Sequence, residues 1–401
     1  MDVTFVLTHD CNLGCSYCYA GKKFRKSMSP EVRDQALALA FAGLRSGSKL
    51  SLCYFGGEPT LEWELLVDTA RKARDLAGAK GIALQQSVTT NGTTLTDARV
   101  AQLGELGVYI ALSIDGNREA HERERPMMGG KSSFDEVFRG LSCLLRAGRS
   151  FDTISVVTPT NAHLLGESVQ YLLGLGVPRM GLNIAYEGDW TPAALEHLTQ
   201  GLAGAAMTVA GHFRNGRVCS VTALESKIRA RLKGGMRKED TCPIGDGTIA
   251  VAPSGNIYPC ERLVGEDDST AYVIGHVATG VVDVQMRKHR DAMPDHHATN
   301  DECHDCGERG RCSAFCACAN LAETGHISVA GGVQCFYERA TMEVADALLH
   351  VMALEKNAVF AEWFSLDFSK PLPDASLPKA PPARIEAREG ERKPHRLHVL
   401  R

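Results

Sequence analysis

Three cysteines crowd the start of the chain. Within the stretch CNLGCSYCYA, Cys11, Cys15 and Cys18 follow a C-x3-C-x2-C spacing. Structural zinc usually takes four protein ligands. A four-iron cluster held by three cysteines keeps one iron free to bind another molecule. By itself, the triplet is compatible with either an iron–sulfur cluster or another metal centre.

Glycines and polar residues follow later strand-like runs. Gly56, Gly57 and Glu58 follow LCYF, a TTNG turn follows the next run, and Ser113 opens SIDG after the one beyond. Adjacent glycines let the backbone approach a ligand closely, and the Glu58 carboxylate can bind an amine. Each motif is weak alone, because most turns of this composition are only turns.

A second set of cysteines occupies the C-terminal half. Eight of the fourteen cysteines lie there: Cys242, Cys260, Cys303, Cys306, Cys312, Cys316, Cys318 and Cys335. The C-x2-C pair among them indicates zinc as readily as iron. With either metal, we expect a small domain whose core is partly its metal sites.

Alternating segments must position these residues. Six apolar, β-branched runs are too continuous for half-exposed antiparallel strands, and they predict buried strands at 3–8, 50–55, 83–90, 108–114, 153–158 and 179–184. Helix-like segments lie between them, one of which begins at Pro30. This alternation predicts parallel strands with right-handed crossovers. The expected fold is α/β, a partial (β/α)6 TIM-type barrel with its site at the carboxyl ends of the strands.

Composition narrows the class of protein. The net charge of −4 over 401 residues gives no basic field for nucleic acid. No apolar run reaches the roughly 18 residues of a membrane span, and the N-terminus is too short and acidic for a secretory signal. We therefore expect a cytoplasmic protein whose cysteines bind metals or react as thiols, with neither nucleic acid nor membrane as a partner.

The chain is long enough for more than one domain. We predict a barrel over 1–190, a helical bridging region over 191–240, a cysteine-organised domain over 241–340, a C-terminal helix over 341–368 and a disordered tail over 369–401.

Taken together and in this order, the motifs resemble those of the radical S-adenosylmethionine (radical SAM) enzymes. The resemblance implies that Cys11, Cys15 and Cys18 bind a [4Fe–4S] cluster whose free iron chelates S-adenosylmethionine (SAM). It also implies the SAM contacts: Tyr17 near the adenine, Gly56, Gly57 and Glu58 at the methionine amine, and Ser113 and Arg125 at ribose or carboxylate groups. The Arg125 match is looser, and a solvated residue in a charge run is the alternative.

The later cysteines resemble the SPASM extension of this family, a C-terminal domain with two auxiliary [4Fe–4S] clusters. The resemblance assigns Cys242, Cys260 and Cys316 to a nearer cluster, and Cys303, Cys306, Cys312 and Cys335 to a farther one. Some relatives carry another cysteine shortly before the position of Cys242, which this chain lacks. Cys318, or less readily Cys219, could replace it; otherwise one iron stays open. Cys53 and Cys143 are expected in the packed core.

The resemblance implies a maturase that abstracts hydrogen from a ribosomally made peptide through a 5′-deoxyadenosyl radical and installs an oxidative crosslink, either a thioether or a C–C bond. One alternative is a sulfatase-type maturase that forms formylglycine on a protein Ser or Cys. Glu261 would then be the catalytic base, although a solvated glutamate is the simpler interpretation. The other alternative is a zinc- or cluster-stabilised binding protein without catalysis.

The implied partners are a precursor peptide or protein and a reductant such as flavodoxin or ferredoxin. Because only ten residues precede Cys11, we also expect a separate leader-peptide-binding protein or direct recognition of the substrate.

Overall fold

The structure is a computed structural model that describes residues 1–237, 240, 242–244, 247–268, 270–284, 301–304, 306–313, 316–370 and 372. Most of the predicted tail lies outside the described residues, so its disorder stays a prediction, as do the predicted domain boundaries. No helix among the described residues is long and apolar enough to cross a membrane.

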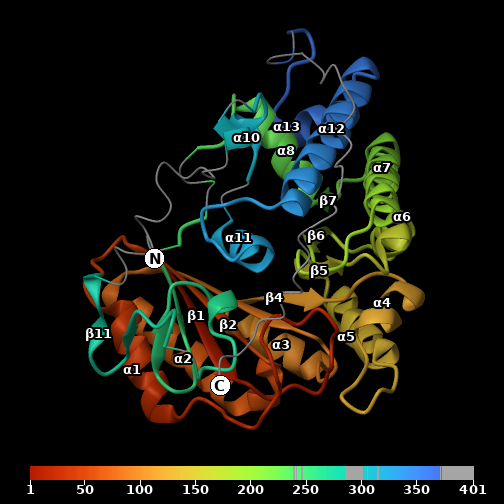
Figure 1. Cartoon of the computed structure of the whole chain (residues 1–401). Helices are drawn as coiled ribbons and strands as arrows, with labels where there is room; N and C mark the ends of the chain where they lie inside the picture. Colours follow the sequence, from red (N-terminus) through yellow and green to blue (C-terminus); the bar gives the residue numbers. More distant parts are fainter. Residues whose placement is uncertain are drawn as a thin grey trace.

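One eleven-stranded sheet runs through the described chain in the order β11-β10-β9-β8-β1-β2-β3-β4-β5-β6-β7 (Figure 1). Its strands are β1 Asp2–Thr8, β2 Lys49–Gly56, β3 Ala83–Thr90, β4 Val108–Ser113, β5 Asp152–Val157, β6 Arg179–Ile184, β7 Ser220–Val221, β8 Thr248–Val251, β9 Asn256–Tyr258, β10 Gly275–His276 and β11 Gly280–Val281. The six predicted runs correspond to β1 through β6, which confirms the partial barrel.

Strands β1 to β7 are all parallel to their neighbours. Strand β8, from the cysteine-rich half, pairs with β1 in parallel, and Val3 lies opposite Ile249. Strands β9, β10 and β11 then continue the sheet with antiparallel pairing. The cysteine-rich half therefore begins within the same sheet as the barrel.

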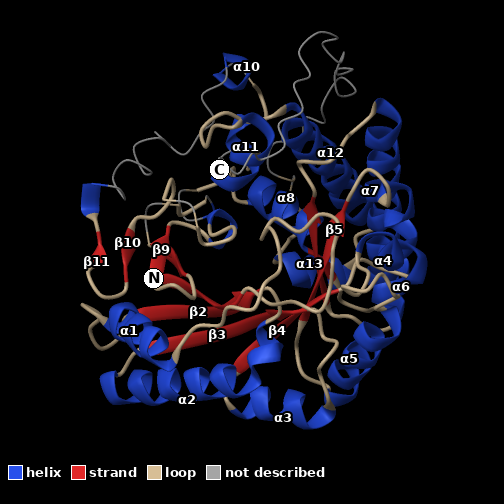
Figure 2. Ribbon diagram, turned by 60° about the horizontal axis from the view of Figure 1, so that its bottom comes forward, coloured by secondary structure: helices blue, strands red, loops and turns tan. Residues whose placement is uncertain are grey.

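Helices lie between the strands as predicted. They are α1 Pro30–Phe41, α2 Trp63–Lys80, α3 Asp97–Glu105, α4 Arg118–Glu124, α5 Phe134–Ala147, α6 Leu165–Gly174, α7 Pro192–Arg214, α8 Thr222–Leu232, α10 Asp301–His304, α11 Ala317–Thr324, α12 Gly332–Leu354 and α13 Ala358–Phe364. Helix α1 begins at the predicted Pro30, where the Ser29 side chain accepts the backbone N–H of Val32. In Figure 2, α1, α2, α3 and α5 lie along the outer side of the arc of β2, β3 and β4, and α11 lies across from them.

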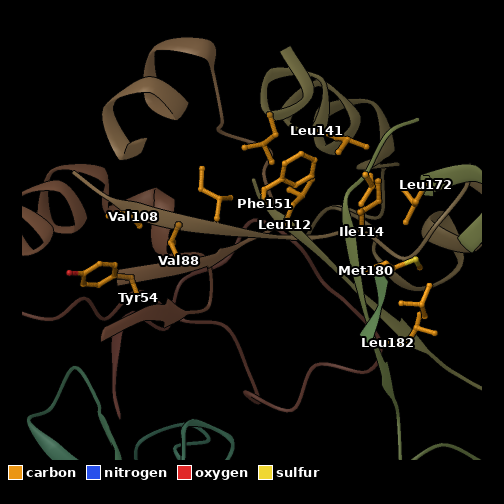
Figure 3. Packing of buried hydrophobic residues seen from close by; sticks show 14 of the residues in the cluster. Tyr54, Val88, Val108, Leu112, Ile114, Leu141, Phe151, Leu172, Met180 and Leu182 are labelled. Carbon is orange, nitrogen blue, oxygen red and sulfur yellow. The ribbon is translucent and has the colours of Figure 1, made fainter. Parts of the chain in front are cut away.

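The main core lies between the strands and these outer helices. In Figure 3, Leu112 of β4 and Phe151 lie beside Leu141 of α5. Burial along β2 and β3 alternates between buried and half-buried residues. The prediction of continuously buried strands therefore holds for β1 but not for β2 and β3, whose second face is less covered than the face that packs against the helices. Cys143 lies in this core as expected, whereas Cys53 is only half-buried.

The C-terminal helical region differs from the single helix predicted over 341–368. Helix α12 begins earlier, at Gly332, and ends at Leu354, and α13 follows it. Between them, Lys356 has a positive φ of 47°, which a continuing helix does not allow.

Candidate active site

The first cysteine triplet lies in the long loop between β1 and α1. The Cys11 Sγ accepts a hydrogen bond from the backbone nitrogen of Leu13 at 3.4 Å. Cys15 lies within electrostatic range of both Cys11 and Cys18, and the Lys23 Nζ donates to the Cys18 Sγ at 2.9 Å. Burial raises the pKa of the Cys11 thiol to about 12, whereas a bound metal favours the thiolate form. The three cysteines lie near one another in this loop.

Gly56 and Gly57 bring the end of β2 against the cysteine loop. The backbone nitrogen of Gly57 donates to the Thr8 carbonyl oxygen at 2.8 Å. A Cβ at Gly57 would lie 2.2 Å from the Asp10 carbonyl oxygen, and Gly56 has a φ of 145°. Only glycine fits both positions. The two glycines thus let the end of β2 pack against the cysteine loop. This packing requires glycine at both positions, independently of the ligand that was expected to approach them.

The Glu58 carboxylate is buried and accepts hydrogen bonds from two different loops; the residue is 1% exposed. Its Oε1 accepts the Thr60 backbone nitrogen at 2.9 Å, the Thr60 hydroxyl, and the Thr90 hydroxyl at 2.7 Å. Its Oε2 accepts the backbone nitrogen of Asn91 at 2.7 Å. Oε1 therefore accepts three donors and Oε2 one, so Oε2 is the less occupied of the two oxygens.

Tyr17 and Arg125 meet around a buried aspartate. The Tyr17 hydroxyl donates to Asp115 at 2.8 Å, and the Arg125 Nη1 donates to the Tyr17 oxygen at 2.6 Å. Burial raises the pKa of Asp115 to about 6, although the Arg125 charge opposes this shift. Because Arg125 is only 5% exposed, the alternative of a solvated residue was wrong. Ser113 ends β4, two residues before Asp115, and is half-buried.

Two further residues fix the cysteine loop: Glu124, which was not singled out from the sequence, and Asn91, which was expected at the same strand ends as Cys11. Glu124 is buried and accepts the hydroxyls of Ser16 and Thr158, which ties this loop to the end of β5. The Asn91 side chain donates to the Asn12 Oδ1 at 2.8 Å, beside Cys11. The position of Asn91 directly after a strand was the available sequence signal.

The later cysteines form two groups. Cys316 lies within electrostatic range of Cys242 and Cys260, so the structure brings together the three residues assigned to the nearer cluster. We call Cys242, Cys260, Cys316 and the adjacent Cys318 the near cysteine group.

The second group, which we call the far cysteine group, contains the four residues assigned to the farther cluster: Cys303, Cys306, Cys312 and Cys335. Cys335 lies within electrostatic range of Cys303 and Cys306. Cys303 and Cys312 both pack on Ala330. The four cysteines thus gather at one place in the fold, although they come from separate segments.

Within the described part of the chain, no three His, Cys, Asp or Glu side chains converge closely enough to hold a single metal ion. A four-iron cluster has a different requirement, because each cysteine binds a separate iron. The cysteines gathered in each group could therefore supply one thiolate to each of several irons.

Glu261 lies between the two cysteine regions. It lines a pocket together with Gly56, Gly57 and Tyr19. The Cys260 thiol donates to its Oε2 at 3.5 Å. Tyr19, which follows Cys18, stacks on Phe55 with ring centroids 6.3 Å apart. A carboxylate on a wall shared with the predicted SAM-binding glycines can take a proton from a group bound there.

Sequence comparison finds relatives among known proteins. The family model for the radical SAM superfamily matches residues 5–184. An uncharacterized protein of Methanocaldococcus jannaschii is 29% identical over 193 residues, 48% of this chain, and the match spans only 64% of that protein's length. A serine-type anaerobic sulfatase-maturating enzyme of Klebsiella aerogenes is 22% identical over 338 residues, 82% of each chain.

Structural comparison finds the same fold in solved structures. The native sulfatase-maturating enzyme anSMEcpe with bound AdoMet has a TM-score of 0.73 at 20% identity, over 87% of this chain and 98% of that one. SuiB of Streptococcus suis, bound to its precursor peptide SuiA, has a TM-score of 0.57 at 14% identity, over 83% and 75% of the two chains. With the motifs and their placement, these findings indicate an enzyme rather than a non-catalytic binding protein, and residues 5–184 form a radical SAM domain.

Proposed function

We propose that this enzyme is a maturase that oxidises one residue of a ribosomally made peptide or protein by two electrons. Support comes from the pocket that Glu261 lines together with Gly56 and Gly57. The sulfatase-maturating relatives, and SuiB with its bound precursor peptide, support the class of substrate.

For the cofactors, we propose the assignment that the sequence motifs imply. Cys11, Cys15 and Cys18 would hold the catalytic [4Fe–4S] cluster, and Tyr17, Gly56, Gly57, Glu58, Ser113 and Arg125 would hold SAM. When bound, the reduced cluster and SAM supply a 5′-deoxyadenosyl radical that takes one hydrogen atom from the substrate. The buried Asp115 and Glu124 fix the loop that carries Tyr17 and Ser16.

Glu261 is the proposed base. After loss of one hydrogen atom, the substrate must still lose one proton and one electron to complete a two-electron oxidation. The proton would go to the Glu261 carboxylate, and the electron to an auxiliary iron–sulfur cluster. The far cysteine group and the near cysteine group are the proposed sites of two such clusters, and a flavodoxin or ferredoxin is the proposed source of electrons for the catalytic cluster.

Two products are compatible with this chemistry. An oxidative crosslink within the peptide is the first candidate. Formylglycine on a Ser or Cys is the second, and Glu261 favours it specifically, because sulfatase-type maturases resemble this chain in carrying an acidic residue directly after the cysteine that corresponds to Cys260. A separate leader-peptide-binding protein is proposed only for the crosslinking maturase.

The test is anaerobic incubation with a Cys- or Ser-containing precursor peptide encoded beside the gene, followed by mass measurement. A crosslink gives an intact peptide that has lost two hydrogens and does not react with a hydrazide. Formylglycine gives a peptide that does react, because it carries an aldehyde. Absence of both products with every neighbouring peptide, while 5′-deoxyadenosine still forms, would contradict the maturase proposal.

A Glu261→Gln variant tests the base. Loss of a positioned general base typically lowers a rate by about 10²–10⁴, so product formation should fall by this factor while 5′-deoxyadenosine still forms. Glu343, an exposed carboxylate on α12, provides the matched control as Glu343→Gln. Product formation that is equal in both variants would remove Glu261 from the mechanism.

A further inference from the structure

Cys318 contacts Cys260 directly. Their Sγ atoms lie 3.1 Å apart, and the Cys318 residue is 5% exposed. It packs with Ile244 and Leu263 in a small core that also touches Cys242 and Cys260. The thiol of Cys318 therefore points into the near cysteine group rather than into solvent or the large barrel core.

Backbone donors surround the sulfurs of this group. The Cys242 sulfur accepts N–H groups of Ile244 and Ala317, and the Cys316 sulfur accepts the N–H of Ala319. Two of these donors, Ala317 and Ala319, belong to the first turn of α11, whose N–H groups have no partner within the helix. Such N–H···S bonds stabilise thiolates, which is the state that binds iron.

The short spacing between Cys316 and Cys318 does not prevent both from facing one site. Within a helix, residues two apart point in different directions. Cys316, however, is the N-cap of α11 and has an extended backbone, with φ −69° and ψ 97°. Cys318 lies inside the first turn. The Arg262 guanidinium lies within electrostatic range of both sulfurs, as expected if they face the same place.

Cys219, the other cysteine considered for this role, does not lie in the near cysteine group. It is buried in the large core near Phe213 and Leu348. Its thiol is under the influence of Arg217 and Glu225 rather than of other cysteines. It therefore serves as a buried thiol for comparison.

We infer that Cys318 is the fourth thiolate of the nearer auxiliary cluster, in place of a cysteine before Cys242. This inference rests on the proposed auxiliary clusters but not on the proposed reaction. A site with four cysteine ligands is closed, so it passes electrons and does not bind a substrate thiol. Any thioether would then have to form without prior attachment of the substrate sulfur to this cluster.

The inference is tested in the full chain carrying Cys11→Ala, Cys15→Ala and Cys18→Ala, where two auxiliary clusters should hold about eight irons. Adding Cys318→Ala should lower the iron content and change the electron paramagnetic resonance (EPR) spectrum of the reduced protein. The matched variant Cys219→Ala should keep both. Met236 packs against the same small core, so Met236→Cys together with Cys318→Ala should restore the lost iron.

A second measurement needs no change at Cys318. Cyanide added to the reduced triple-alanine protein should leave its EPR spectrum unchanged, because both clusters lack an open iron. A spectrum that shifts with cyanide would overturn the inference. So would a Cys318→Ala protein that keeps all its iron and its spectrum. Neither readout uses substrate or activity, so failure here is distinct from failure of the proposed maturase reaction.

Discussion

The guanidinium carbon of Arg262 lies 4.4 Å from the centroid of the Tyr19 ring, a cation–π contact. Tyr19 lies within electrostatic range of both Cys18 and Cys260. The pair therefore lies near cysteines of both the proposed catalytic cluster and the proposed nearer auxiliary cluster. Its position suits both the transfer of electrons between the two sites and the control of the charge around them.

Replacing Arg262 should make the nearer cluster harder to reduce. A cation close to the thiolates stabilises the reduced, more negative form of a cluster. Arg262→Gln should thus lower its reduction potential by on the order of 60 mV, which is about 1.4 kcal/mol for one electron. An EPR redox titration measures this shift. Arg229, a half-exposed cation on α8, gives the control Arg229→Gln, and equal potentials in the two variants would contradict the assignment.

Glu58→Gln should weaken SAM binding. A charge-assisted hydrogen bond contributes about 1.5–3 kcal/mol, so the dissociation constant should rise about ten- to a hundredfold. The variant should also melt at a lower temperature, because the new amide nitrogen would face donors that now bond the carboxylate. Calorimetric titration with SAM and thermal unfolding measure the two effects. The exposed Glu64 offers the control Glu64→Gln, and an affinity unchanged by Glu58→Gln would remove Glu58 from the SAM site.

Asp267→Asn should lower the free energy of unfolding by about 1.5–3 kcal/mol, the range for hydrogen bonds to a charged group. The buried Asp267 carboxylate accepts Lys26 from the barrel loop at 3.2 Å, and it accepts Ser254 and Tyr258 at 2.8 and 3.0 Å from the cysteine-rich half. Asp267 thus links the barrel to the cysteine-rich half through hydrogen bonds and an ion pair. Its neighbour Asp268 is exposed, so Asp268→Asn should change the stability little.

The same carboxylate gives a pH dependence. Burial alone raises the pKa of Asp267, but the His9 ring, whose Nε2 lies 3.8 Å from Oδ2, and hydrogen bonds from Ser254 and Lys26 outweigh it and hold the pKa below its usual range. An acid with a lowered folded-state pKa stabilises the fold above its unfolded pKa, about 3.9. This contribution should therefore be present at neutral pH and disappear as the pH falls below about 4. Denaturation curves of wild type and Asp267→Asn should converge in acid; a constant difference down to pH 2 would contradict this account.

The sequence was informative where a local pattern determines the structure. The β1 to β6 runs and the start of α1 at Pro30 follow from residue type and spacing within short segments. The parallel pairing of β8 with β1 could not be predicted, because it joins segments about 245 residues apart and depends on the whole sheet.

The candidate site shows the same limit. Motif spacing grouped Cys11, Cys15 and Cys18. The hydrogen bonds that Thr60, Thr90 and Asn91 donate to the Glu58 carboxylate, however, depend on how three loops pack. The position of Cys318 depends on the extended backbone at Cys316 and on contacts with a segment some 58 residues earlier. Such contacts arise from tertiary packing between distant segments, so a short stretch of sequence does not predict them.

The most direct test of the account is reductive cleavage of SAM by the chain with Cys11, Cys15 and Cys18 all replaced by Ala. Under anaerobic conditions with dithionite, wild type and the core-cysteine control Cys143→Ala should form 5′-deoxyadenosine, detected by chromatography. The triple variant should form none while it keeps about eight of about twelve irons in its auxiliary clusters. Continued formation of 5′-deoxyadenosine by the triple variant would contradict the assignment of the catalytic cluster to these three cysteines.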